Sequence, residues 1–184
     1  DYLNSKNIVT AKNKIHNTAK IHKTCIINGN QIVIGKNVLI ESNVVINEKS
    51  KIMDNSIIRS GSIIGGDQLE LKQDENKNLF NVKHKGSTII GKNVEIGYGT
   101  IIDRAVFDYD FTKIGNFTKI GNNTTIGHNS KIGKNNMIMS NIVVGASGDR
   151  EAFLFLLLLI WVEMASFQIA ILYKGSSLVS QKSS

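Results

Sequence analysis

Histidine is the residue type in this chain best suited to proton transfer near neutral pH, because its unperturbed pKa is about 6.5. The chain contains four His. His16 and His22 each follow an Ile in the phrase IHNTAKIHKT, where turn geometry and hydrogen bonding are the expected roles. His84 lies in a polar segment and has no assigned role. His128 stands in the turn phrase IGHNS, where Gly or a small polar residue would suffice, and is therefore the candidate catalytic residue.

A turn histidine of this kind could act as the general base of an acyl transfer. Attack of an amine or hydroxyl on a thioester needs a group that takes the proton, and the tetrahedral intermediate needs a hydrogen-bond donor for its oxyanion. Three six-residue steps after His128 lies Ala146, whose backbone N–H is the candidate donor. The pattern alone leaves a second interpretation open, a turn histidine that is merely exposed to solvent.

Other chemistry has less support in the sequence. There is no GxxxxGK[ST] phosphate loop, no Cys/His cluster with zinc spacing and no Ser nucleophile elbow, so we expect no metal and no bound cofactor. Asp103 and Asp110 could form a carboxylate pair, but Asp residues at turns are usually solvated. The single Cys25 excludes an intrachain disulfide.

Aliphatic residues recur every six positions over most of the chain. This period fits neither an amphipathic helix nor an alternating strand, but it fits short flat strands that turn after each hexapeptide, with Gly or Asn at the corners. Three such faces make one coil, so the sequence predicts an all-β parallel β-helix of about six coils. A one-residue slip after Ile27 predicts a bulge. The repeat positions are Ile15, Ile21 and Ile27, then Ile34, Ile40, Ile46, Ile52, Ile58 and Ile64, and then Ile90, Ile96, Ile102, Asp108, Ile114, Ile120, Ile126, Ile132, Ile138 and Val144.

The repeat divides the chain into a lead-in (1–14), a β-helix domain (15–149) and a C-terminal tail (150–184). Within the domain, residues 67–88 break the period with a charged segment that we expect to be a loop. An insertion of this length is either functional or tolerated decoration. In a trimer it could reach a neighbouring copy and wall an active site.

The tail changes character abruptly. Residues 152–173 are mostly apolar, and we expect them to be helical and long enough to span a bilayer, although Glu163 lies at their centre. Three interpretations remain: a membrane anchor with a cytoplasmic body, a helix that caps the solenoid, or an aberrant or truncated end. We favour the third, because the repeat stops in mid-coil. The chain begins with Asp1 and a polar stretch, in which no signal peptide is recognised, and truncation of the N-terminus stays open. We expect a cytoplasmic protein, with membrane association through residues 152–173 as an alternative.

Residues 15–147 resemble the UDP-3-O-acylglucosamine N-acyltransferase family of lipid A biosynthesis. The similarity rests on the phrases Ile102-Asp103-Arg104 and Ile126-Gly127-His128-Asn129. It implies a left-handed β-helix, a homotrimer, His128 as general base and the Ala146 amide as oxyanion donor. Asp103, Arg104 and Asn129 would bind substrate.

The resemblance also implies the reaction: a 3-hydroxyacyl group would pass from acyl carrier protein to the amine of a UDP-linked acylglucosamine. A net charge of +7 is compatible with such anionic partners. Two departures keep alternatives open, because Gly121 replaces an Asp of the family and Ala146 replaces a Gly. The alternatives are a sugar acetyltransferase that uses acetyl-CoA and a catalytically disabled trimeric scaffold. Nucleic-acid binding is not expected, because the Lys residues are scattered over the repeats with few aromatics between them.

Overall fold

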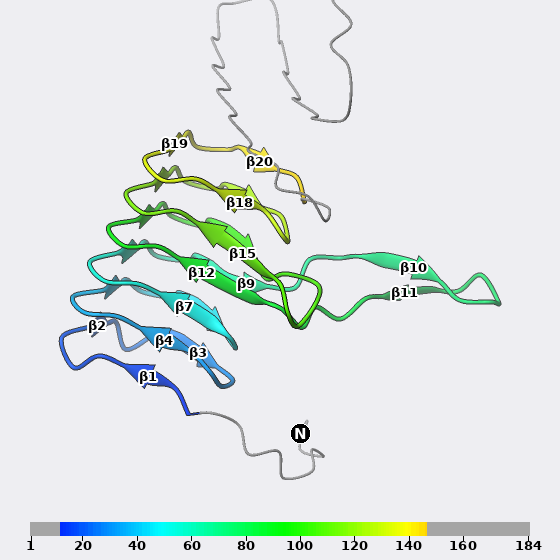
Figure 1. Ribbon diagram of the computed structural model, residues 1–184, viewed down its shortest axis with the longest axis horizontal. Coiled ribbons are helices and arrows are strands. Elements are labelled where there is room, and N and C mark those ends of the chain that lie inside the picture. The colour runs from blue at the N-terminus through cyan, green and yellow to red at the C-terminus, as the bar shows by residue number, and fades with distance from the viewer. Residues whose placement is uncertain (1–11, 147–184) are drawn as a thin grey trace, which may run out of the picture.

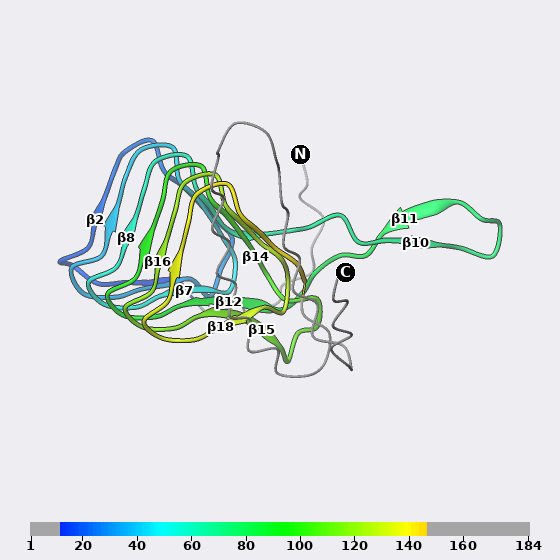
Figure 2. The ribbon, with the colours of Figure 1, turned by 90° about the horizontal axis from the view of Figure 1, so that it is seen from above.

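The hexapeptide repeats form a left-handed parallel β-helix with the shape of a triangular prism (Figures 1 and 2). The computed structural model describes residues 12–146. Each of the three faces is a six-stranded parallel sheet, so the prism has six coils, as the sequence predicts. The predicted C-terminal tail and most of the lead-in lie outside the described residues. Within residues 12–146, no helix is long and apolar enough to cross a membrane.

Successive strands along the chain occupy the three faces in turn. The first face contains β1 (Lys14–Ile15), β4 (Val33–Ile34), β7 (Ser50–Ile52), β12 (Ser87–Ile90), β15 (Phe111–Ile114) and β18 (Lys131–Ile132). The second contains β2 (Lys20–Ile21), β5 (Leu39–Ile40), β8 (Ile57–Ile58), β13 (Glu95–Ile96), β16 (Lys119–Ile120) and β19 (Met137–Ile138). The third contains β3 (Ile26–Asn28), β6 (Val45–Asn47), β9 (Ile63–Gly66), β14 (Ile101–Asp103), β17 (Thr125–Ile126) and β20 (Val143–Val144).

The core is a set of columns of stacked Ile side chains. In the second face, for example, Ile96 is in register with Ile58 on one side and with Ile120 on the other. Ile58 and Ile96 are 0% exposed, and burial of one such side chain contributes about 1.5–3 kcal/mol. The inward Ile positions that the repeat predicts are therefore the core.

Asn residues at six-residue intervals turn the corners of the prism. Asn55, Asn93, Asn123, Asn129 and other corner Asn residues have φ between 51° and 62°. This left-handed region is costly for most side chains but is tolerated by Asn. The sequence pattern allowed Gly or Asn at the corners, and the structure assigns this conformation mainly to Asn.

Outside the insertion, the β-helix departs from the six-residue period at two places, one of them predicted and one not. Ile15 pairs with Ile34, so the first coil contains one extra residue, which confirms the bulge predicted after Ile27. Asp108, in contrast, does not lie on a face of the prism. β14 is followed directly by β15, and residues 104–110 form a loop between them. The predicted repeat position at Asp108 is therefore wrong, because a polar side chain there cannot replace Ile in the core.

The predicted loop 67–88 is mostly a β-hairpin that extends away from the prism (Figures 1 and 2). It contains β10 (Leu71–Gln73) and β11 (Leu79–Asn81), which pair antiparallel. The insertion ends earlier than predicted, since Ser87 and Thr88 already belong to β12. Its apolar side chains are exposed: Leu69, Leu71, Leu79 and Phe80.

Three charged side chains link neighbouring coils on the second face. Arg59 lies 2.6 Å from Glu41 and 2.5 Å from Glu95. Burial raises the pKa of Glu41, but its hydrogen bonds with Arg59 and Ser60 outweigh this effect and the pKa lies below its ordinary value. The Arg59 guanidinium likewise lowers the pKa of Glu95.

We expect Arg59→Gln to lower the free energy of unfolding by about 1 kcal/mol at pH 7, since the pairs are partly exposed. Because folding lowers both pKa values, this contribution is present above the unfolded pKa of about 4.3 and is lost as the pH falls through the folded values. Urea unfolding at pH 7 and pH 3.5 measures it. A difference between variant and wild type that does not become smaller from pH 7 to pH 3.5 would contradict the ionic origin.

Candidate functional site

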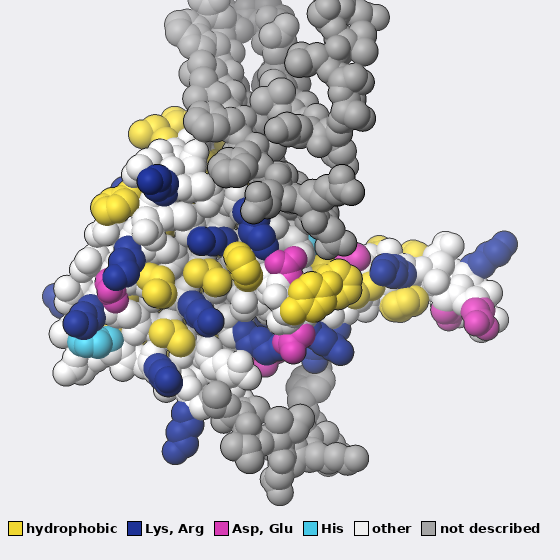
Figure 3. Space-filling model, in the orientation of Figure 1, with side chains coloured by type: hydrophobic (Ala, Val, Ile, Leu, Met, Phe, Trp, Pro, Cys, Tyr) yellow, Lys and Arg dark blue, Asp and Glu magenta, His cyan; other side chains and the backbone are white. Residues whose placement is uncertain are grey.

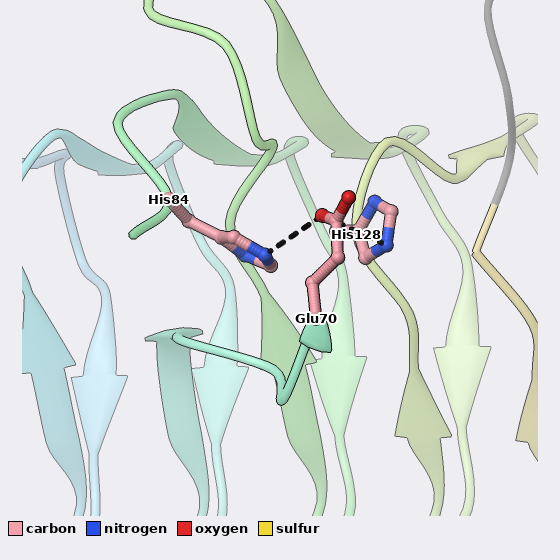
Figure 4. Close-up of side chains that lie close together, drawn as sticks. All are labelled: Glu70, His84 and His128. Atoms are coloured by element: carbon pink, nitrogen blue, oxygen red, sulfur yellow. Dashed lines mark ion pairs between the residues drawn. The ribbon is translucent and has the colours of Figure 1, made fainter. Parts of the chain in front are cut away.

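The predicted catalytic histidine lies in the turn between β17 and β18. The stick view in Figure 4 shows the imidazole of His128 facing the carboxylate of Glu70, with His84 on the other side of that carboxylate. The His128 side chain is 19% exposed, so solvent and substrate can reach it. The neighbouring residue Asn129 turns the corner with φ 62°.

Asn129 determines which ring nitrogen of His128 carries the proton. Its side-chain oxygen lies 3.0 Å from His128 Nδ1 and accepts a hydrogen bond from the Val106 N–H at 3.1 Å. Its amide nitrogen donates to the Asp110 carboxylate. Because an amide oxygen can only accept, His128 Nδ1 is the protonated nitrogen and Nε2 keeps its lone pair. This is the tautomer that a general base needs.

Asp110 holds the amide of Asn129 as a charged acceptor. Burial raises the pKa of Asp110, but Lys131 at 2.6 Å and the Phe111 N–H outweigh that effect, so its pKa lies below the ordinary value. The carboxylate therefore stays ionised near neutral pH. The sequence analysis considered Asp110 only as one of two paired carboxylates and missed its role as the residue that orients Asn129.

We expect Asp110→Asn to lower kcat by roughly tenfold or more while the KM for the acyl donor changes little, because the base loses its orientation and not its substrate. Asp108→Asn is the matched control, since Asp108 lies in the same loop with its side chain 73% exposed. Steady-state kinetics of the two variants make the comparison. Equal losses in both would show that Asp110 does not position the site.

Ala146, the predicted oxyanion donor, lies one coil away from the turn that contains His128. A Cβ atom added to Gly127 would be 2.7 Å from the Ala146 nitrogen, so only Gly permits this close approach. The Ala146 N–H donates to no acceptor within residues 12–146. Among the described residues, the Ala146 nitrogen thus lies against Gly127, the residue that precedes His128.

Asp103 and Arg104, predicted to bind substrate, are both buried beside the base of the hairpin. Burial raises the pKa of Asp103, and the nearby His84 and His128 oppose this increase. The Arg104 guanidinium lies 2.9 Å from Glu48 and 3.0 Å from Asp67, so its charge already has two carboxylate partners. Arg104 thus anchors the start of the hairpin to the prism.

Two residues beside His128 were not predicted from the sequence: Glu70 was not singled out, and His84 had no assigned role. His84 Nε2 lies 3.4 Å and His128 Nε2 lies 4.0 Å from Glu70 Oε2. The two imidazole rings are 5.1 Å apart in an edge-to-face arrangement. Glu70 and His84 come from the two sides of the hairpin base, so no periodic signal marks them. The presence of a His in a polar insertion was the one available sign.

Two groups of this cluster are buried without the hydrogen bonds that they need. His84 is 0% exposed, and neither of its ring nitrogens has a hydrogen-bond partner in the described part of the chain; the same holds for Glu70 Oε2. The 3.4 Å approach between them lacks hydrogen-bond geometry. An unsatisfied buried polar group costs about 1–3 kcal/mol, so a ligand that satisfies these atoms is expected.

The surroundings of the cluster carry mixed charge. On the face shown in Figure 3, Lys and Arg side chains are spread over the prism and do not form one continuous stripe. An open groove of about 540 Å³ lies on the second face and is lined by Arg59, Tyr98, Lys119 and Met139 among others. It contains Gly121 but no residue of the His128 cluster, so the groove and the cluster are separate features.

The comparisons with known proteins agree with the fold. Residues 31–66 and 111–146 match the family model described as bacterial transferase hexapeptide (six repeats). These two segments therefore carry hexapeptide repeats of the bacterial transferase type. No curated protein matches the sequence.

Several solved structures match part of this chain. GDP-perosamine N-acetyltransferase from Caulobacter crescentus is 11% identical, with 76% of this chain and 58% of that chain covered and a TM-score of 0.45. UDP-N-acetylglucosamine acyltransferase from Francisella novicida is 20% identical, with 73% and 52% covered and a TM-score of 0.38. UDP-N-acetylglucosamine O-acyltransferase from Moraxella catarrhalis is 23% identical, with 72% and 65% covered and a TM-score of 0.38. The chain thus spans between 52% and 65% of the length of these structures.

Proposed function

We propose that the protein is an acyltransferase that moves an acyl group from a thioester to an amine on a nucleotide-linked sugar. One observation carries the proposal. Asp110 accepts a hydrogen bond from Asn129, and Asn129 accepts one from His128 Nδ1, so the lone pair of His128 Nε2 is free at a partly exposed turn. The hexapeptide repeats of bacterial transferase type support the same class of activity.

In the proposed mechanism, the acceptor amine attacks the thioester carbonyl while His128 Nε2 takes its proton. The backbone N–H of Ala146, which lies in the adjacent coil, stabilises the oxyanion of the tetrahedral intermediate. Collapse of the intermediate breaks the carbon–sulfur bond. The imidazolium then returns the proton to the leaving thiolate, so the base is regenerated without a cofactor.

We propose acyl carrier protein as the donor and a UDP-linked acylglucosamine as the acceptor, as in lipid A biosynthesis. The net charge of +7 is compatible with an acidic carrier and with the UDP phosphates. We also propose a homotrimer, in which the hairpin β10–β11 reaches the neighbouring copy. The exposed Leu71, Leu79 and Phe80 on this hairpin support such a contact, since large apolar side chains gathered on an extended arm favour burial.

The proposal is tested by incubating the purified full chain with 3-hydroxyacyl-acyl carrier protein or with acetyl-CoA. The acceptors are a UDP-linked acylglucosamine with a free amine and the same sugar with the amine acetylated. We expect mass spectrometry to show acylation of the free amine only, from the carrier protein. Transfer from acetyl-CoA alone would replace the donor, and a folded trimer without any turnover would indicate a scaffold.

A further inference from the structure

Glu70, His84 and His128 together have the donor set and the spacing of a transition-metal site. One ligand atom from each of the three lies within 4.8 Å of the other two. The two shorter separations, 3.4 Å and 4.0 Å, meet at Glu70 Oε2 (Figure 4). Tetrahedral zinc with ligand bonds of about 2.0–2.2 Å needs separations of roughly 3.3–3.5 Å between ligand atoms, which small side-chain rotations would reach.

The buried state of His84 points to a ligand and not to a packing role. The ring is completely buried, and within residues 12–146 neither of its nitrogens has a hydrogen-bond partner. Glu70 Oε2, which faces it, is buried and unpaired in the same part of the chain. A cation between them would bond to both atoms at once. The metal would bond to His84 Nε2, the ring nitrogen that lies 3.4 Å from Glu70 Oε2.

The surrounding structure already orients the ligands. The Glu70 N–H donates to Asn81 at 2.8 Å, and the Glu70 carbonyl accepts from the Val82 N–H at 2.8 Å, so the hairpin base holds the carboxylate close to His84. The side-chain oxygen of Asn129 accepts a hydrogen bond from the Nδ1–H of His128, which leaves Nε2 free to coordinate. A hydrogen bond from the other ring nitrogen is the usual support of a metal-bound histidine.

We propose that Glu70, His84 and His128 bind a divalent transition metal, with Zn²⁺ as the best match to two imidazoles and one carboxylate. Within residues 12–146 three protein ligands converge, which leaves the fourth position of the tetrahedron open. The metal uses the lone pair of His128 Nε2. If the proposed acyl transfer holds, Zn²⁺ is therefore a reversible inhibitor that competes with proton abstraction.

The experiment measures metal binding directly, without substrates. Full-length chain that has been treated with a chelator and dialysed is titrated with ZnCl₂ by isothermal calorimetry, and with CoCl₂ by visible absorption, which reports tetrahedral coordination. We expect one metal ion per chain. Glu70→Gln and His84→Ala should each weaken binding by roughly 10- to 100-fold. His22→Ala is the matched control and should bind as wild type, since His22 lies in the first coil with Thr24 as its partner.

Circular dichroism spectra establish that each variant is folded, and Glu70→Gln is the more conservative of the two because it keeps the size of the side chain. Absence of stoichiometric binding by wild type, or equal affinity in all variants, would overturn the metal site. A chain that binds Zn²⁺ but transfers no acyl group would keep the site and reject the proposed function. Acyl transfer by chelator-treated protein that binds no Zn²⁺ would support the proposed function and reject the metal site.

Discussion

Replacement of His128 by Ala is expected to lower kcat for acyl transfer by about 10²- to 10⁴-fold, the range that a positioned general base contributes. Hydrogen bonds between Asp110 and Asn129 and between Asn129 and His128 Nδ1 leave the lone pair on His128 Nε2. Without it, the attacking amine must lose its proton to water. Single-turnover kinetics with saturating acyl donor measure the chemical step separately from product release.

The matched control is His22→Ala. Like His128, His22 stands at a turn after an inward Ile, but its ring contacts Thr24 at 2.9 Å and it lies in the first coil. We expect it to retain wild-type kcat. A His128→Ala variant with more than one tenth of the wild-type kcat would reject general-base catalysis by this residue. A similar loss in both variants would indicate a general effect on the fold.

Replacement of Ile96 by Ala is expected to lower the free energy of unfolding by about 2–5 kcal/mol. The side chain is completely buried in the middle of a column, in register with Ile58 and Ile120. In a solenoid each coil is stabilised by its neighbours, so the cavity weakens the contacts with both adjacent coils. This is a large part of the total stability of an ordinary domain.

Urea unfolding at fixed protein concentration measures this effect, because an oligomer would make the midpoint depend on concentration. Ile26→Ala is the matched control: the same substitution in a strand whose Ile26 side chain is 57% exposed. We expect it to cost less than about 1 kcal/mol, since little apolar surface leaves the core. Equal costs at the two positions would contradict the column of Ile side chains as the main source of stability.

The repeating part of the structure could be predicted from the amino-acid sequence. Inward Ile residues at every sixth position define the three faces, because burial of these side chains is possible only if each hexapeptide makes one flat strand and one turn. The same period placed Ala146 one coil after His128, and the structure has this arrangement at Gly127. The slip after Ile27 was likewise readable as an extra residue.

Segments that interrupt the six-residue period were predicted less accurately than the repeats. Asp108 lies at a multiple of six residues from Ile90, but it belongs to a loop and not to the core. A loop of about six residues preserves the numerical period without forming a strand. The insertion at 67–88 was expected to be a loop. Its antiparallel hairpin depends on pairing between Leu71 and Asn81, which no local sequence pattern predicts.

The residues that make up the site come together through long-range contacts of the folded chain. Glu70 and His84 meet because the hairpin closes at its base, and both reach His128 because the third and first faces share an edge with that base. The ionised Asp110 lies beside Asn129 only after residues 104–110 leave the prism as a loop. These contacts join residues that are distant in sequence. The six-residue period is sufficient to predict the columns of Ile, but it does not predict such contacts.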